Sequence, residues 1–251
     1  MAIMLFIIGC ILGSFYLVLG TRLPIKEDVV KSRSRCDHCK KNLKWYHLIP
    51  LFSFIFLKGK CAYCHKKISA EHFFVELGTG LAFLATYYFF PQGYNLYAGL
   101  TICSLLIVIF VSDFKYMIIL DSPLIVSSII ILALKYFYFG WMEVLYVLIG
   151  GISLFILMYL VQIIGNFAFK KESLGGGDIK LSFVIGLILG LKLGLVALIL
   201  SAFLALPYAV ASMYLNKESE FPYGPFLGGA LLIVFYNYDK FVLLFNYLFR
   251  F

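Results

Sequence analysis

Four cysteines stand in two pairs whose spacing suits a tetrahedral metal ion. Cys36 and Cys39 form one Cys-x-x-Cys pair, Cys61 and Cys64 form the other, and 21 residues lie between the pairs. Each such turn can direct two thiolates toward one ion, so the two pairs predict a closed four-sulfur zinc site. The iron of a rubredoxin-like site uses the same ligands and is the alternative ion. Because four sulfurs leave no open position, we expect a structural rather than a catalytic metal.

The segment around these cysteines predicts a small module that depends on its metal. A module of about fifty residues has too little core to fold securely alone, and a bound ion compensates. Two disulfides are the alternative, but they are rare in the cytoplasm, where the charge pattern places this segment. Six apolar side chains could pack on the metal or lie against a bilayer, and we expect core packing for all of them. They are Trp45, Leu48, Ile49, Phe52, Phe54 and Phe56.

Two aspartates in the apolar part of the chain could form a proteolytic pair. Asp113 ends an apolar run, and Asp178 follows the three glycines at 175–177. These glycines permit a close backbone approach and a sharp entry into a helix, which puts Asp178 near that helix's N-terminus. Two carboxyls at hydrogen-bond distance share a proton, so one can draw a proton from water while the other polarises a scissile carbonyl. This is the arrangement of an aspartic protease.

Four neighbours of this pair are predicted to support it. Asp121 follows Asp113 by eight residues, and on a continuous helix the two carboxylates would lie on nearly the same face. An ordinary polar residue of a helical region, just before Pro123, is the alternative interpretation of Asp121. The other supporting candidates are Gly175, Gly177 and Lys180.

The elements that must position these residues are membrane helices. The chain is 63% apolar and 14% charged, far from the soluble average of about half apolar and a quarter charged. Eight apolar runs predict an all-α membrane protein of about eight transmembrane helices, with seven as the alternative because 179–191 is short. The runs are 2–20, 73–90, 94–112, 116–138, 141–165, 179–191, 194–214 and 226–248.

Composition divides the chain into three parts, and the distribution of charge predicts its orientation in the membrane. These are a first transmembrane helix at 1–20, a cytoplasmic zinc-binding insert at 21–71 and a polytopic core at 72–251. With the N-terminus outside, seventeen of the 21 lysines and arginines fall on the cytoplasmic side, as the positive-inside rule requires. Asp113 and Asp178 then lie at the cytoplasmic membrane edge. The net charge of +8 is explained by topology and lipid headgroups, so no nucleic-acid partner is expected.

Two other function classes and one packing question remain open from the residues alone. A transporter could use the two aspartates as proton or cation carriers, although coupling sites usually lie near the bilayer midplane. An electron-transfer protein could be built around iron in the four-cysteine site. Gly186, Gly190 and Gly194 form a small-residue stripe that suits close helix packing, either within one bundle or between two chains.

A series of further motifs runs along almost the whole chain in a fixed order. They are Gly13-Ser14-Phe15, Arg22-Leu23-Pro24, Ile49-Pro50 and Gly59-Lys60-Cys61 within the cysteine insert, Glu76, Asp113 with Asp121, Gly175 to Lys180, and Tyr223-Gly224-Pro225-Phe226-Leu227. In this order the chain resembles the bacterial type IV prepilin leader peptidases, including their competence-pseudopilin relatives. Leu120 departs from the proline usual in that family, and Tyr223 replaces a common phenylalanine, a change we expect to be neutral.

The resemblance implies a membrane aspartic endopeptidase of the cytoplasmic (inner) membrane. Such an enzyme removes the basic leader of a prepilin or pseudopilin after a glycine and then methylates the new N-terminal amine from S-adenosylmethionine. By the motif match Asp113 and Asp178 are the catalytic residues, and the cysteine insert accompanies the methyltransferase activity. Prepilin and membrane lipid are the implied partners. No Rossmann-type glycine loop locates the S-adenosylmethionine site, so its residues are left unassigned.

Overall fold

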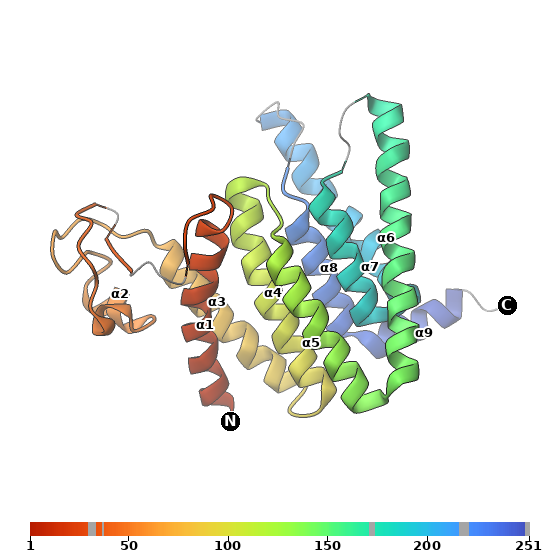
Figure 1. Ribbon diagram of the computed structural model, residues 1–251, viewed down its shortest axis with the longest axis horizontal. Helices are drawn as coiled ribbons and strands as arrows, with labels where there is room; N and C mark the ends of the chain where they lie inside the picture. Colours follow the sequence, from red (N-terminus) through yellow and green to blue (C-terminus); the bar gives the residue numbers. More distant parts are fainter. Residues whose placement is uncertain (30–33, 37, 171–173, 216–220, 249–251) are drawn as a thin grey trace. The chain divides into compact units, whose positions relative to one another are not determined.

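The regular structure of this protein is helical, as the sequence predicts. The computed structural model describes residues 1–29, 34–36, 38–170, 174–215 and 221–248. Within these ranges no strand forms, which confirms the all-α class. The chain divides into two compact units, Met1–Leu96 and Tyr97–Phe251, whose helices are labelled in Figure 1.

The first unit joins two long helices to the cysteine insert. Its elements are α1 (Ala2–Arg22), the 3-10 helix η1 (Trp45–Leu48), α2 (Phe52–Phe56) and α3 (Glu71–Phe89). Helices α1 and α3 pack through small residues. A Cβ atom on Gly9 would lie 2.8 Å from the Gly80 Cα, and one on Gly13 would lie 2.8 Å from the Thr79 Oγ1. The glycines therefore allow a backbone approach that any larger side chain would prevent.

The second unit is a bundle of helices joined by short turns. Its helices are α4 (Tyr94–Tyr116), whose first turn precedes the unit boundary, α5 (Asp121–Phe139), α6 (Trp141–Phe169), α7 (Gly176–Leu215), α8 (Gly224–Tyr236) and α9 (Tyr238–Leu248). Helix α7 packs against α5, α6 and α8. At the turn between α5 and α6, the buried Lys135 ammonium donates to the Glu143 carboxylate at 3.0 Å. This ion pair ties the two helices together beside Gly140.

Several of these helices have the length and hydropathy of membrane spans. In the described part of the chain, α1, α4, α5, α6 and α7 each qualify, and α8 with α9 forms a sixth candidate bent by 88°. Helix α3, which corresponds to the predicted run 73–90, is not among them. The runs 179–191 and 194–214 form the single long helix α7, interrupted at Gly190 with φ 73° and ψ −179°. A positive φ is open to glycine at little cost, so the break falls where the sequence permits it.

Packing within the bundle accounts for the predicted stripe of small residues. A Cβ atom on Gly186 would lie 2.5 Å from the Gly151 Cα, and one on Gly150 would lie 2.9 Å from the Leu191 backbone nitrogen. Helices α6 and α7 thus approach with backbone against backbone, and they run side by side in Figure 1. This contact also fixes the first segment of α7, which carries Asp178 in its first turn.

We expect Gly186→Ala to destabilise the bundle by about 1–3 kcal/mol, because the added methyl group forces two backbones apart. The matched control is Gly229→Ala in α8, where a Cβ meets nothing within 4 Å. That change should be neutral or stabilise by up to about 1 kcal/mol through helix propensity. Thermal unfolding of both purified variants in one detergent makes the comparison. Equal stability of the two would show that the α6–α7 contact is looser than described.

Candidate active site and metal site

Asp113 lies in the last turn of α4 and is held by the start of α8. Its side chain is buried, and its Oδ2 accepts a hydrogen bond from the Gly224 backbone N–H at 3.0 Å. The first N–H groups of a helix have no partner within the helix and carry partial positive charge, so they favour a nearby carboxylate. Pro225 at the helix start lacks an N–H and suits this position.

Glycine is required at position 224 by the space around it. A Cβ atom there would lie 2.9 Å from the Asp113 Oδ2 and 2.8 Å from the Ile119 Cδ1. Any side chain would therefore displace the carboxyl from the helix end. The sequence motif contained Gly224, but nothing in the sequence indicated that its N–H meets Asp113.

Asp178 lies in the first turn of α7, against the glycines that precede it. Its backbone N–H donates to the Gly175 carbonyl at 3.1 Å, and a Cβ on Gly175 would lie 3.0 Å from the Asp178 Oδ2. The Asp178 side chain is buried, and its Oδ1 has no hydrogen-bond partner among the described residues. A buried polar oxygen without a partner is costly. A proton, a water molecule or a substrate group would satisfy it.

The two aspartates belong to one site. A Cβ on Gly177 would lie 2.7 Å from the Ile119 Cβ, and Ile119 also contacts Gly224. Ile119, in the turn between α4 and α5, therefore lies between the starts of α7 and α8. Asp113 is close enough to act electrostatically on Asp178. The structure thus brings together the two acids that the sequence paired, and it adds Ile119 as a packing residue that no sequence pattern marked.

Tyr223 and Ser201 form a hydrogen-bonded pair beside Asp178. The Tyr223 hydroxyl and the Ser201 Oγ are 2.7 Å apart. Because the buried Ser201 Oγ donates to the Leu198 carbonyl at 2.7 Å, its lone pairs accept the Tyr223 proton. Burial raises the pKa of Tyr223, so the phenol stays protonated. A phenylalanine at position 223 could not form this hydrogen bond. Nothing in the sequence indicated that Tyr223 has this partner.

Asp121 and Lys180 pair with each other at the ends of two helices. Helix α4 ends at Tyr116, Met117 has a φ of 54°, and α5 begins at Asp121. Asp113 and Asp121 therefore do not share a continuous helix. The Lys180 Nζ donates to the Asp121 Oδ1 at 2.7 Å, and both side chains are more than half exposed. Such an exposed pair contributes about 0–1 kcal/mol, so it orients the starts of α5 and α7 more than it stabilises them.

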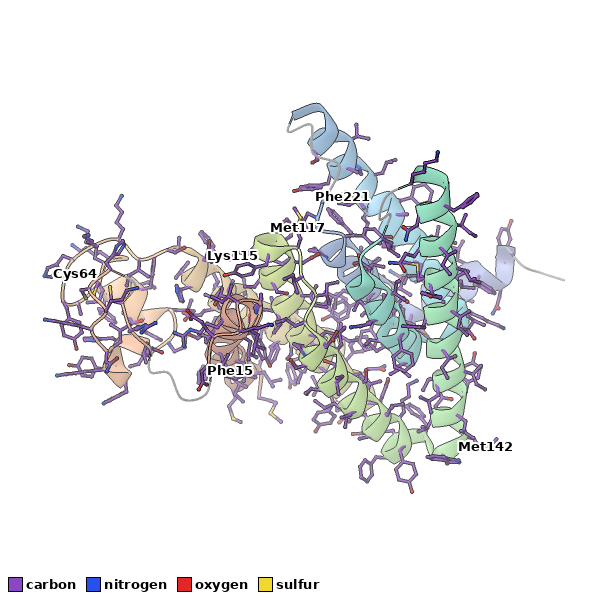
Figure 2. All side chains as sticks on the ribbon, turned by 45° about the horizontal axis from the view of Figure 1, so that its top comes forward. Phe15, Cys64, Lys115, Met117, Met142 and Phe221 are labelled. Atoms are coloured by element: carbon purple, nitrogen blue, oxygen red, sulfur yellow. The ribbon has the colours of Figure 1, made fainter. Side chains whose placement is uncertain are left out.

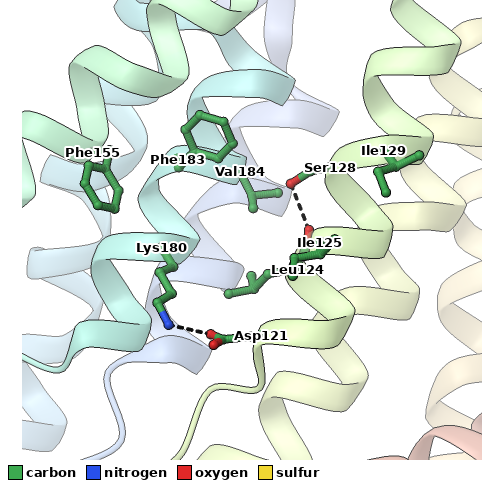
Figure 3. Close-up of a pocket in the computed structure, with 9 residues that line it drawn as sticks. All are labelled: Asp121, Leu124, Ile125, Ser128, Ile129, Phe155, Lys180, Phe183 and Val184. Atoms are coloured by element: carbon green, nitrogen blue, oxygen red, sulfur yellow. Dashed lines mark hydrogen bonds and ion pairs between the residues drawn. The ribbon is translucent and has the colours of Figure 1, made fainter.

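An apolar groove begins at this ion pair, as Figure 3 shows. It lies between α5, α6 and α7 and encloses about 350 Å³. The groove is lined by Asp121, Leu124, Ile125, Ser128, Ile129, Phe155, Lys180, Phe183 and Val184. Apart from the ion pair and Ser128, whose hydroxyl donates to the Leu124 carbonyl at 2.8 Å, these side chains are apolar.

The four cysteines of the insert converge as the sequence predicts. Their Sγ atoms all lie within 4.8 Å of one another, and those of Cys36 and Cys64 are 3.9 Å apart. Tetrahedral zinc with bonds of about 2.3 Å places its sulfurs about 3.8 Å apart. All four are free thiols in this structure. The donor set therefore fits zinc.

The two cysteine turns share one local geometry. The Lys40 N–H donates to the Cys36 carbonyl at 2.8 Å, and the His65 N–H donates to the Cys61 carbonyl at 3.0 Å. Lys40 and His65 have φ values of 57° and 56°. Backbone N–H groups of Cys64 and Tyr63 lower the pKa of Cys61 to about 7. The backbone thus favours the thiolate, which is the form that binds a metal.

Core packing of the insert is achieved by fewer apolar residues than the sequence suggested. The Phe54 ring lies 5.4 Å from that of Phe73 and covers Gly59. Trp45, Phe52 and Phe56 are instead 77%, 62% and 79% exposed, and Leu48 and Ile49 are exposed as well. The expectation of core packing is therefore wrong for these five side chains.

The fold and the two sites define a class: a polytopic helical membrane protein with a buried aspartate pair and a four-cysteine module. Comparison with known proteins narrows this class. Residues 7–90 match the bacterial peptidase A24 N-terminal domain, and residues 100–210 match the type IV leader peptidase family. The chain belongs to the type IV leader peptidase family. No solved structure matches it.

Several relatives carry the name prepilin leader peptidase/N-methyltransferase, among them three from different bacteria. The Bacillus subtilis protein is 31% identical over 95% of both chains, and the Vibrio cholerae protein is 31% identical over 92% of this chain and 94% of its own. The Myxococcus xanthus protein is 34% identical over 74% of this chain and 55% of its own. The first two similarities include both the cysteine insert and the aspartate pair.

Replacing Cys36 and Cys39 together with serine should release the metal, because a hydroxyl is a poor substitute for a thiolate ligand. Elemental analysis of the purified protein should find about one zinc per chain before the change and almost none after it. Cys10→Ser and Cys103→Ser are the controls, since both residues are buried in long helices. An unchanged zinc content in the double variant would contradict the four-sulfur site, and stoichiometric iron would replace zinc as the assigned ion.

Proposed function

We propose that this protein is a membrane aspartic endopeptidase that removes the basic leader from type IV prepilins or pseudopilins. The observation that carries the proposal is the buried pair of carboxyls, one against the start of α8 and the other in the first turn of α7. The names of its relatives supply the substrate class. The motif that includes Asp113 and Asp178 matches the family along the same chain.

The geometry supports general acid–base catalysis by the two aspartates. One carboxyl, ionised, takes a proton from water as the water oxygen attacks the scissile carbonyl. The other, protonated, donates a hydrogen bond to the carbonyl oxygen and stabilises its developing charge. Asp113 already accepts the Gly224 N–H, which favours its ionised form. Asp178, whose Oδ1 lacks a partner among the described residues, is the better candidate for the protonated partner in the resting enzyme.

Methylation of the new N-terminus follows cleavage in this proposal. S-adenosylmethionine would supply the methyl group. The names of the relatives support this activity, and the four-cysteine insert at 21–71 is the part that we associate with it. The groove between α5, α6 and α7 has an almost wholly apolar lining, so it does not suit the binding of this charged cofactor. We therefore assign no residue to the cofactor.

We further propose that the active site faces the cytoplasm from a multi-pass inner-membrane core at 72–251. The excess of lysine and arginine on that side supports this orientation, with the N-terminus outside. Lys115 and Lys180 lie at the helix ends that carry Asp113 and Asp178. The transporter alternative has no support among the relatives, whose names are those of peptidases.

Asp113→Asn and Asp178→Asn should each lower cleavage by about a thousand-fold or more, because an amide cannot accept the proton of water. Since the two acids act as a unit, the double variant should be scarcely worse than either single one. Incubation of purified enzyme with a membrane-embedded prepilin, followed by mass spectrometry, measures the product. Asp121→Asn is the matched control, and it should keep measurable activity because Asp121 forms an exposed ion pair with Lys180.

Two outcomes would count against this assignment. Substantial cleavage by both Asp113→Asn and Asp178→Asn would refute the aspartic-protease mechanism. Loss of cleavage only in Asp121→Asn would mean that the wrong acid of the α4–α5 turn has been chosen. Zinc content and membrane insertion should stay at the wild-type level in all of these variants, since the cysteines lie in the other unit.

The Cys36→Ser, Cys39→Ser variant should lose methylation to a greater extent than cleavage. The physical reason is that a closed metal site organises the insert, whereas the carboxyls that cut belong to another compact unit. The same mass spectra distinguish uncleaved, cleaved and methylated products. Equal and complete loss of both activities in a protein that still inserts would contradict this separation.

A further inference from the structure

The cysteine insert carries an exposed apolar surface that neither the metal nor the active site uses. Its exposed side chains are those of Trp45, Leu48, Ile49, Phe52, Ile55 and Phe56. We call this surface the aromatic face. Large exposed apolar patches on a protein surface mark a site of interaction. In Figure 2 many side chains of the insert, around the labelled Cys64, project outward.

The face has the periodicity of one helix side. Phe52, Ile55 and Phe56 stand at positions i, i+3 and i+4 of α2, which places them together on one side. Phe54 points to the other side, where it packs on Phe73. The rings of Phe52 and Phe56 are stacked, with centroids 6.4 Å apart. Helix α2 therefore packs on Phe73 of α3 with Phe54 on one side, and its other side is aromatic and exposed.

A strained turn holds this exposed side in place. Leu51 has φ 61° and ψ −51°, and the Phe52 N–H donates to the Pro50 carbonyl at 2.7 Å, which is the rare γ-turn. The Leu51 N–H in turn donates to the Oε2 of Glu76, a buried carboxylate of α3, at 2.8 Å. Strain of this kind persists only where the surroundings enforce it. The aromatic face is thus fixed relative to α3 rather than attached to a free loop.

The surroundings of the aromatic face are strongly cationic. From Arg35 to Ala70 the sequence contains eight lysines and arginines but one acid. The lysines are exposed, and the Nζ of Lys44 lies 5.7 Å from the centroid of the Tyr46 ring. Even a zinc–tetrathiolate centre, which carries two negative charges, leaves the insert positive. Exposed aromatic side chains among lysines are the composition of a surface that binds anionic lipid.

We propose that the aromatic face docks the insert on the surface of an anionic bilayer, with Trp45, Phe52 and Phe56 in the interfacial layer. The covalent connection of the insert to a membrane helix favours the bilayer as its partner. The insert begins directly after α1, a candidate membrane span that ends at Arg22, and it ends at α3. Its lysines pair with anionic headgroups while the aromatic rings enter the layer beneath them. The four-cysteine site would then be held at the membrane surface.

The two tryptophans of the chain make this proposal measurable by fluorescence. Trp141→Phe leaves Trp45 as the single tryptophan, since the sequence has only these two, and excitation at the red edge of the absorption band avoids the tyrosines. The full-length variant is placed in nanodiscs of phosphatidylcholine with a minority of phosphatidylglycerol, with or without lipids brominated near the top of the acyl chain. We expect blue-shifted Trp45 emission, several-fold quenching by brominated lipid and weak quenching by aqueous acrylamide. Quenching by brominated lipid should fall in pure phosphatidylcholine.

Two variants in the same background connect the signal to the face. Phe52→Ser with Phe56→Ser should reduce quenching by brominated lipid several-fold while zinc content stays unchanged. Tyr88→Ser is the matched control, because Tyr88 is 72% exposed but lies near the other end of α3. It should leave the Trp45 signal as it was.

Three results would overturn the proposal. Trp45 emission typical of water, without quenching by brominated lipid, would show that the face stays in solvent. Protection from both quenchers would show that protein covers it, either the second unit or another chain. Equal quenching in neutral and anionic nanodiscs would remove the role of the lysines and with it the anionic surface as the partner.

Discussion

Burial of two carboxyl groups among helix ends is the constraint that shapes the second unit. A carboxylate removed from water needs donors or a neutralising proton. Asp113 takes its donor from the first N–H of α8, and Asp178 lies within the first turn of α7. The starts of both helices must therefore approach the end of α4. Glycine at 177 and 224 gives Ile119 the room to lie between them.

Because the starts of α7 and α8 must approach the end of α4, the contacts that α7 makes along its length determine the geometry of the site. Helix α7 is packed backbone to backbone on α6 at Gly186 and Gly151, so its first segment is held over more than two turns. Tyr223 is fixed from the far side by Ser201, which lies on the second segment of α7. Helix α7 thus carries Asp178 itself. It also positions the start of α8, through the hydrogen bond between Ser201 and Tyr223. Positioning of this precision is what acid–base catalysis depends on.

Sequence patterns predicted the parts of the protein whose chemistry is local. The cysteine spacing predicted the four-sulfur cluster, and the glycines before Asp178 predicted its place in the first turn of a helix. Two predictions depended on information that the sequence does not contain. The first is the relation of Asp113 to Asp121. A turn at Met117, which has a positive φ, ends α4 between them, although the apolar pattern of the sequence continues through this point. The exposure of Trp45 and Phe56 could not be predicted, since hydrophobicity alone does not tell a protein core from a membrane surface.

The break at Gly190 has a consequence for how water reaches the site. The segment of α7 from Gly176 to the break is about 21 Å long at 1.5 Å per residue. This is shorter than the roughly 30 Å hydrocarbon layer, and lipid next to a short segment thins to match it. Asp178 lies in the first turn of that segment, at the end that the proposed orientation places on the cytoplasmic side, so thinning would bring the aqueous phase toward its carboxyl. Hydrolytic water would then reach the site from the lipid–water boundary.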